Sequence, residues 1–158
     1  MTAGWPSLVK YFSPVTDSLL RDPDGTRMDV LLMQTLDAWR EKVGSPFHVT
    51  SGYRSQDLQD ELLAGGKTQT KLSAHTLGKA VDGYFKKTPI WQVFLDAIRY
   101  NFKGVGLYTF TIPPIIHVDI HDRGEKVKAL WIVTADQRYL YAPSPEFYSS
   151  LRSVLSVL

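Results

Sequence analysis

The 158-residue chain contains no cysteine, and this absence removes a whole class of chemistry. Disulfide frameworks, thiolate metal sites and cysteine nucleophiles are all excluded. The chain also lacks any apolar run of about 18 residues, the length that a helix needs to cross a bilayer. Its formal net charge is only +2, so the charge gives no indication of binding to nucleic acid. The hydrophobic content of 44% is typical of a globular protein.

The N-terminal residues 1–12 lack the basic start and the continuous apolar stretch of a secretory signal peptide. We therefore expect synthesis in the cytoplasm without such a signal. No repeat, low-complexity segment or linker divides the chain, so we expect one domain over residues 1–158. A domain of this size buries about 70% of the surface that its unfolded chain exposes, and it needs no disulfide to be stable.

The apolar periodicity predicts four helices separated by strand-like runs. The first helix is expected to begin at Thr26, whose spacing from Asp29 is that of a capping box, and to end at Gly44. The other helices are expected at 56–63, from 88–89 onward, and at 145–158, and residues 13–25 are expected to form an ordered surface loop. The expected strands are 47–50, 79–85, 105–110, 115–121, 130–134 and 138–142, the last two forming a hairpin. This order predicts an α+β fold with a small, largely antiparallel sheet on which the helices pack.

The segment 115–121 reads Ile-Ile-His-Val-Asp-Ile-His and carries the clearest chemical signal. Successive side chains of a strand point to opposite faces, so the apolar residues between the polar ones face a core. His117, Asp119 and His121 then lie in a row on the other face. Such a row indicates either a solvated face or a functional site, and this segment alone does not distinguish them.

A second segment, 73–82, places His75 and Asp82 seven positions apart. Fully extended, this distance is up to ~23 Å, so the two side chains can meet only if the chain folds back between them. Gly78 supplies the backbone freedom for such a turn. Taken alone, the pair is more typical of a loop histidine and a surface aspartate.

Together, two histidines and one carboxylate from these segments would make the ligand set of a catalytic zinc, with a fourth position open for water. Such a metal lowers the pKa of its water and polarises a carbonyl, which suits amide hydrolysis. Arg54 follows an expected strand and Gly52, and its planar guanidinium could hold a peptide carboxylate through two parallel hydrogen bonds. Most arginines lie on solvated surfaces, so this role has little support by itself.

Five motifs along the chain together resemble those of the zinc D-alanyl-D-alanine carboxypeptidase family. That family shares its fold with lysostaphin-type peptidases and the hedgehog signalling domain. The resemblance covers residues 11–131, and the C-terminal hairpin and helix occupy 130–158. The motifs are Ser51-Gly52-Tyr53-Arg54-Ser55, Ser73-x-His75-x-x-Gly78-x-Ala80-x-Asp82, Gly104-x-Gly106-x-Tyr108, His117-Val118-Asp119 and a later Trp131.

The resemblance implies Zn2+ bound by three ligands, which are His75, Asp82 and His117. It also implies that Arg54 binds a substrate carboxylate, and Ser51 and Tyr108 from the same motifs are expected to bind substrate with it. The implied substrate is a peptidoglycan stem peptide, cut by a D,D-carboxypeptidase or by an endopeptidase of the endolysin type. We expect a monomer that acts on the cell wall, in the setting of a phage lysin or a virion-associated hydrolase.

One departure concerns the general base. Many relatives carry an acid or a histidine just upstream of the second zinc histidine, whereas residues 111–116 here offer no such group. Asp119 is then a candidate base, or it orients His117 as a hydrogen-bond acceptor, and the sequence leaves both roles open. His121, where relatives often carry arginine, is a candidate for stabilising the oxyanion. The missing base also favours an alternative, a zinc-containing cell-wall or protein-binding module that hydrolyses nothing; a metal-free structural domain would leave the polar rows unexplained.

Overall fold

The computed structural model describes residues 4–124 and 126–156. In these ranges lie four α-helices, six β-strands and two short 3-10 helices. The helices are η1 (Trp5–Ser7), η2 (Ser18–Leu20), α1 (Val30–Val43), α2 (Gln56–Ala64), α3 (Ile90–Arg99) and α4 (Pro145–Ser156). The strands are β1 (Phe47–Ser51), β2 (Ala80–Phe85), β3 (Gly104–Tyr108), β4 (Ile115–Asp119), β5 (Ala129–Val133) and β6 (Tyr139–Tyr141). No helix in the described ranges is long and apolar enough to span a membrane.

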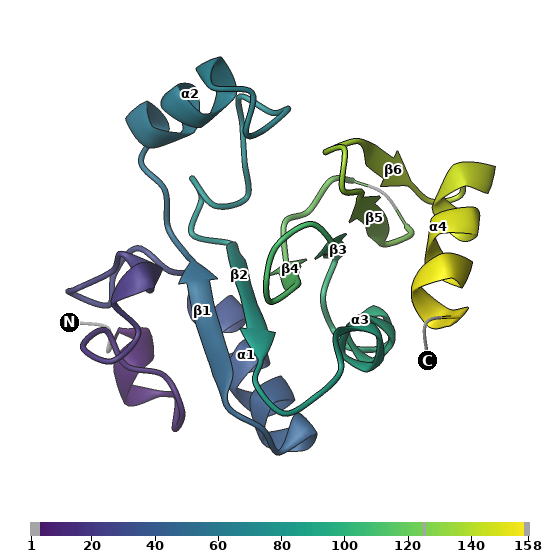
Figure 1. The fold of residues 1–158 in the computed structure, drawn as a ribbon. Coiled ribbons are helices and arrows are strands. Elements are labelled where there is room, and N and C mark those ends of the chain that lie inside the picture. Colours follow the sequence, from purple (N-terminus) through teal and green to yellow (C-terminus); the bar gives the residue numbers. More distant parts are fainter. Residues whose placement is uncertain (1–3, 125, 157–158) are drawn as a thin grey trace.

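The strands form one open sheet in the order β1-β2-β4-β3-β5-β6 (Figure 1). Each neighbouring pair is antiparallel except β3 and β5, which run parallel. The predicted α+β class and the largely antiparallel sheet are therefore confirmed. Strands β5 and β6 also form the predicted hairpin, in which Trp131 lies opposite Tyr141.

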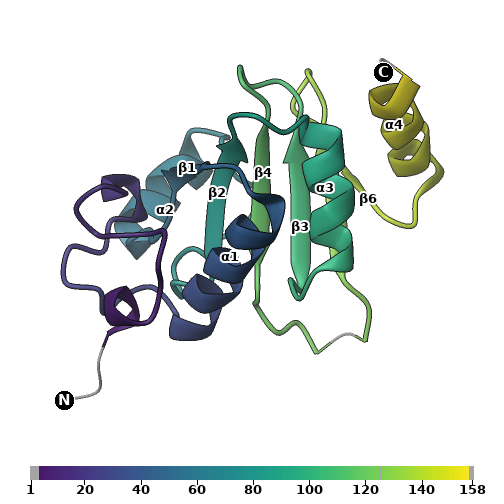
Figure 2. The same cartoon turned by 90° about the horizontal axis from the view of Figure 1, so that it is seen from below.

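Helices α1 and α3 cover one face of this sheet (Figure 2). Trp39 of α1 lies edge-on to the rings of Phe85 and Phe102, with centroid distances of 5.0 and 5.1 Å. Val105 of β3 and Val118 of β4 are fully buried on the same side. Removing apolar surface from water at about 25 cal/mol per Å² stabilises this layer. The other face of the sheet is left to the polar residues of the candidate site.

Helix α1 begins later than the sequence pattern predicts. Asp29, rather than Thr26, is the N-cap, because its carboxylate accepts hydrogen bonds from the amides of Leu31 and Leu32 at 2.8 and 3.2 Å. The strand predicted over 115–121 ends at Asp119, where the side-chain carboxylate accepts the amide of His121 at 2.9 Å. The predicted C-terminal helix is present up to Ser156, and the part of that prediction at 157–158 lies outside the described residues.

The segment 13–25 is more than the surface loop that its two prolines predict. Leu20 is fully buried, and Asp22 is only 2% exposed. The Asp22 carboxylate accepts four hydrogen bonds, from the Trp5 indole at 2.6 Å and from the backbone amides of residues 26, 27 and 28 at 2.8 to 2.9 Å. This carboxylate therefore ties the N-terminal segment to the chain that leads into α1.

Candidate metal centre

One row of paired residues crosses the sheet and defines the candidate site. Asp82 of β2 pairs with His117 of β4, His117 pairs with Gly106 of β3, and Gly106 pairs with Trp131 of β5. Residues that pair directly across strands project to the same face of a sheet. Asp82, His117 and Trp131 therefore lie on one face, the one opposite α1 and α3.

His75 reaches this row from the turn before β2. The turn is closed by a hydrogen bond from the Lys79 amide to the Ala74 carbonyl at 2.8 Å. Gly78 has a φ of +66°, and a Cβ there would lie 1.9 Å from the Arg27 carbonyl oxygen, so only glycine fits. The fold-back that the sequence requires between His75 and Asp82 is thus present.

The protonation of His75 follows from its contacts. Its Nδ1 lies 2.7 Å from the Gly52 carbonyl oxygen, which can only accept, so Nδ1 carries a proton. Burial lowers the pKa of His75, more strongly than neighbouring Asp82 raises it, so the ring is neutral. Its Nε2 then directs a lone pair at Asp82 Oδ2, 3.3 Å away. A cation between the two atoms satisfies this arrangement, which two acceptors alone do not.

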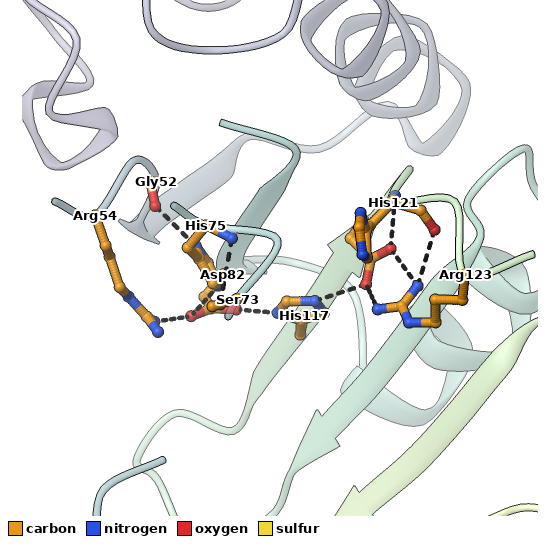
Figure 3. A network of polar contacts seen from close by, with 9 residues as sticks. Gly52, Arg54, Ser73, His75, Asp82, His117, His121 and Arg123 are labelled. Atoms are coloured by element: carbon orange, nitrogen blue, oxygen red, sulfur yellow. Dashed lines mark hydrogen bonds and ion pairs between the residues drawn. The ribbon is translucent and has the colours of Figure 1, made fainter. Parts of the chain in front are cut away.

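His117 lies between two carboxylates. Its Nδ1 is 2.7 Å from Asp82 Oδ1, and its Nε2 is 3.0 Å from Asp119 Oδ2 (Figure 3). Burial alone would lower the pKa of His117, but the hydrogen bonds to Asp119 and Asp82 outweigh it and raise the pKa to about 9. The ring therefore carries a proton on each nitrogen, and a metal ion at Nδ1 would replace one of them.

The three residues lie close enough together to hold a metal ion. His75, Asp82 and His117 are all buried, and one ligand atom from each lies within 4.8 Å of the others. Two imidazoles and one carboxylate suit zinc and leave a coordination position open. Burial would raise the pKa of Asp82, but the two histidines hold it well below its usual range, so the carboxylate is ionised. The structure thus brings together the three ligands implied by the family resemblance.

Asp119 is saturated by donors. Arg123 donates to it through both terminal nitrogens, at 2.9 Å to Oδ1 and 2.7 Å to Oδ2, and the His121 amide adds a third hydrogen bond. With His117 Nε2, all four contacts hold a carboxylate that has no exposed surface. Burial would raise the pKa of Asp119, yet Arg123 and His117 lower it far below the usual range. Arg123 follows β4 in a loop without periodicity, and no sequence pattern pointed to it.

Two glycines of β3 explain the motif Gly104-x-Gly106. A Cβ at position 104 would lie 2.1 Å from an Asp119 oxygen, and one at position 106 would lie 2.3 Å from the Trp131 indole. The absent side chain at 104 leaves room for the Asp119 carboxylate, and the one at 106 lets Trp131 extend over β3, so that its ring centroid is 4.9 Å from that of His117. β3 therefore lies between β4 and β5 in the sheet, yet the side chains of His117 and Trp131 meet across it.

Two of the candidate ligands, His75 and His117, line a cleft of about 300 Å³. Predicted site residues among its lining are Arg54, His75, Tyr108, His117 and His121. Loop 68–74 forms one wall. Arg54 donates to Asp82 Oδ2 at 2.9 Å and to the Ser51 hydroxyl at 3.1 Å, so that Ser51 supports Arg54. Burial raises the pKa of Tyr108 well above its usual value, which keeps its hydroxyl protonated.

Comparison with known proteins places this geometry in a family. A family model described as "Peptidoglycan L,D-endopeptidase MepK" matches residues 9–125 of the chain. The chain belongs to this family. The MepK family lies in the same superfamily as the D-alanyl-D-alanine carboxypeptidases, so the resemblance carried by the motifs is confirmed.

Individual relatives match over a shorter stretch. MepK of Escherichia coli (strain K12) is 32% identical over 74 residues, which are 47% of this chain and 40% of the relative. MepK of Shigella flexneri matches with the same identity and coverage, so the chain spans well under half the length of these relatives. Among solved structures, the L-Ala D-Glu endopeptidase ChiX of Serratia marcescens has a TM-score of 0.42 and 25% identity, covering 53% of this chain and 62% of that one.

The range matched by the MepK family model stops before the last two strands. Trp131 of β5 and Tyr139 and Tyr141 of β6 nevertheless line the same cleft as the candidate ligands. Trp131 belongs to one of the sequence motifs, and the hairpin was predicted. The two tyrosines were given no role, although their alternation along β6 is a signal that could have pointed to a shared face.

Proposed function

We propose that the protein is a zinc-dependent endopeptidase that hydrolyses peptide bonds in peptidoglycan stem peptides. The observation that carries this proposal is the buried set of His75, Asp82 and His117, whose two histidines line a cleft, in a chain of the MepK family. Two histidines and one carboxylate leave a coordination position at which chemistry can occur. The proposal includes action on the cell wall and the phage-lysin setting expected from the sequence.

The residues around the ligands have distinct proposed roles. A bound zinc ion would supply Lewis acidity, lowering the pKa of a water and polarising the scissile carbonyl. Asp119 is a positioning residue, which accepts His117 Nε2–H and so aims Nδ1 at the centre. His121, for which the sequence suggests stabilisation of the oxyanion, lines the cleft and is proposed instead as the acceptor of the proton that the attacking water loses. Arg54 is proposed to hold a substrate carboxylate, with Ser51 and Tyr108 supporting substrate binding.

An endopeptidase fits this cleft better than a carboxypeptidase. Its lining extends from Arg54, which contacts Asp82, past His117 to Tyr141 on the edge strand β6. A carboxypeptidase must close one side behind the terminal carboxylate, whereas an endopeptidase leaves room for chain on both sides of the bond. The family description favours bonds between an L- and a D-residue, and we propose this class of bond for the chain.

Mass spectrometry of purified muropeptides tests the proposal directly. Digestion with the zinc-loaded protein is expected to give fragments cut inside the stem peptide, and a chelator is expected to abolish them. Release of free D-alanine alone would instead identify a D,D-carboxypeptidase. His75→Ala is expected to lose both activity and about one equivalent of zinc in elemental analysis. Full activity of that variant would contradict the metal assignment.

One observation favours a second candidate, a zinc-containing wall-binding module without hydrolytic activity. Within the described residues, no aspartate or glutamate lines the cleft, so a carboxylate base is not at hand there. Zinc-loaded protein that leaves every muropeptide intact, yet co-sediments with purified cell walls, would support this candidate. Loss of cleavage in His121→Gln with zinc content unchanged would support the peptidase.

A further inference from the structure

We propose that Trp131, Tyr139 and Tyr141 form a sugar-binding subsite, which holds the glycan strand beside the stem peptide. This inference rests on the proposed function, because it assumes that the substrate is peptidoglycan. The subsite lies on the β5–β6 hairpin, beyond the residues that the family model matches. It would therefore give this chain a preference for glycan-linked substrate that the metal centre alone does not supply.

The three rings are arranged as one wall of the cleft. Trp131 and Tyr141 are paired residues whose ring centroids are 6.4 Å apart. Tyr139 lies two positions from Tyr141 on the same strand face, and the two rings are 6.2 Å apart and nearly parallel, with an interplanar angle of 22°. All three line the cleft together with His117. The aromatic wall thus continues the register row that contains the candidate metal ligands.

The wall has features of a binding surface rather than of core packing. Tyr141, a large aromatic side chain on the edge strand β6, is 49% exposed. Trp131 is 8% exposed; its buried Nε1–H interacts with the side chain of Tyr108 but makes no hydrogen bond of good geometry to a described residue. The indole nitrogen can only donate. A buried donor in a cleft wall is satisfied when a ligand brings an acceptor such as a hydroxyl or an amide oxygen.

Charge separates the two ends of the cleft. Among the described residues, those that the β5–β6 hairpin contributes to the cleft carry no ionisable group apart from tyrosine hydroxyls, and burial raises the pKa of Tyr141, so that it stays neutral. The cationic side chains of the lining, Arg54 and Arg123, come from other elements. Stem peptides carry free carboxylates, whereas N-acetylated sugars are uncharged, with apolar ring faces and polar edges. A neutral aromatic wall with hydroxyl groups matches the sugar.

The distance from the centre to the wall also suits a glycan attached to the peptide. From β4, which carries His117, to β6, which carries Tyr141, the sheet takes three interstrand steps. At ~4.8 Å a step this is roughly 14 Å. An extended peptide covers that distance in about four residues. A sugar at the wall therefore leaves a short piece of stem peptide to reach the scissile bond.

Binding of a sugar without any peptide tests the subsite independently of catalysis. We would titrate 15N-labelled protein with N,N′-diacetylchitobiose, an uncharged disaccharide, and follow the indole N–H signal of Trp131, assigned with Trp131→Phe. We expect a saturable shift in the wild type that is lost in Tyr141→Ala. Tyr148→Ala is the matched control and should keep the shift, because Tyr148 of α4 is similarly exposed, at 45%. No shift in the wild type would overturn the inference.

Kinetics with paired substrates tests the same wall during turnover. One substrate is a stem peptide linked to its disaccharide, and the other is the same peptide without sugar. We expect kcat/KM to be about tenfold higher for the linked substrate, the size of effect that one good aromatic contact gives. Tyr141→Ala should remove most of this preference, and Tyr148→Ala should retain it.

The two experiments separate this inference from the proposed function. Equal kcat/KM values for both substrates, in an active enzyme, would overturn the subsite and leave the peptidase intact. Saturable chitobiose binding by a protein that cuts neither substrate would support the subsite and contradict the peptidase. A Trp131 shift caused by the free peptide, with none caused by chitobiose, would assign the wall to peptide and overturn the inference.

Discussion

Asp82 and Asp119 contact the two nitrogens of one imidazole, and their surroundings differ. Asp82 Oδ1 accepts a hydrogen bond from His117 Nδ1, and Asp82 Oδ2 accepts one from Arg54. The same Oδ2 also faces the unprotonated Nε2 of His75. Asp119 has both oxygens filled by donors, namely Arg123 twice, the His121 amide and His117 Nε2. Asp82 is 8% exposed, and Asp119 is completely buried.

This difference makes Asp82 a candidate metal ligand and Asp119 a residue that positions His117. A metal needs an oxygen that faces other electron-pair donors, and only Asp82 meets that condition. A general base must reach a water in the cleft, and Asp119 has neither exposed surface nor a spare acceptor position. Of the two roles that the sequence leaves open for Asp119, its hydrogen-bond partners therefore favour the orientation of His117.

The most damaging substitution should be Asp82→Asn. It removes a negatively charged candidate ligand, and the amide nitrogen cannot bind a cation. We expect zinc binding to be lost and hydrolysis to fall roughly a thousandfold or more, which corresponds to ~4 kcal/mol. Zinc content by elemental analysis and muropeptide cleavage measure the two effects. A variant that retains its zinc would remove Asp82 from the ligand set.

Asp119→Asn should have the next largest effect, through His117. The variant loses the charge that fixes His117 Nε2–H, and we expect zinc affinity to fall about 10- to 100-fold. Competition with a chelating dye measures the affinity, and circular dichroism checks the fold. An unchanged affinity combined with a large loss of kcat would instead make Asp119 the base and break the comparison with Asp82.

Asp22 offers the same kind of saturated carboxylate outside the candidate metal centre. Burial would raise its pKa, but the hydrogen bonds from Met28, Trp5 and neighbouring amides lower it. A depressed folded-state pKa contributes stability above the unfolded value of about 3.9, and this is lost as the pH falls through the folded value. Asp22→Asn should destabilise the protein by about 2 kcal/mol at pH 7, lowering Tm by roughly 4–8 °C.

The pH dependence is the sharper measurement for Asp22. The Tm difference between wild type and the Asp22→Asn variant should be constant around neutral pH and should shrink below about pH 4. Thermal melts across that range measure it. A Tm difference that does not change with pH would mean that Asp22 stabilises the fold through its packing rather than through its charge.

The smallest effect is expected for the arginine on the Asp82 side. Arg54→Lys keeps the charge but loses the planar fork, so we expect KM for a carboxylate-bearing substrate to rise about tenfold. Zinc affinity should change little. Arg123→Lys is the counterpart, and it should weaken zinc binding more than substrate binding, because Arg123 holds Asp119. If both variants changed KM and zinc affinity to the same extent, the proposed difference in role, with Arg54 binding substrate and Arg123 holding Asp119, would be contradicted.

Much of the site could be predicted because its signals are local. Strand alternation pointed to His117, and the turn at Gly78 made it possible for His75 and Asp82 to meet. The start of α1 was misplaced because Thr26 and Asp29 are both good caps, and only the fold decides between them.

The missed features depend on contacts between distant parts of the chain. Arg123 is a loop residue whose partner is fixed only once β4 ends at Asp119. The burial of Asp22 requires Trp5 to fold back over it, and no periodicity in the sequence records such a contact. The aromatic wall required the register between β5 and β6 as well as their existence.

Strand β3 limits which substitutions the sequence of this protein can accept. Because Gly106 has no side chain, the ring of a candidate ligand on β4 touches the indole of a wall residue on β5, across an intervening strand. The metal centre and the hairpin are therefore not independent modules. A protein engineer could exchange the hairpin to alter substrate preference only if position 106 stays glycine, because a side chain there would collide with the Trp131 indole, which packs against His117.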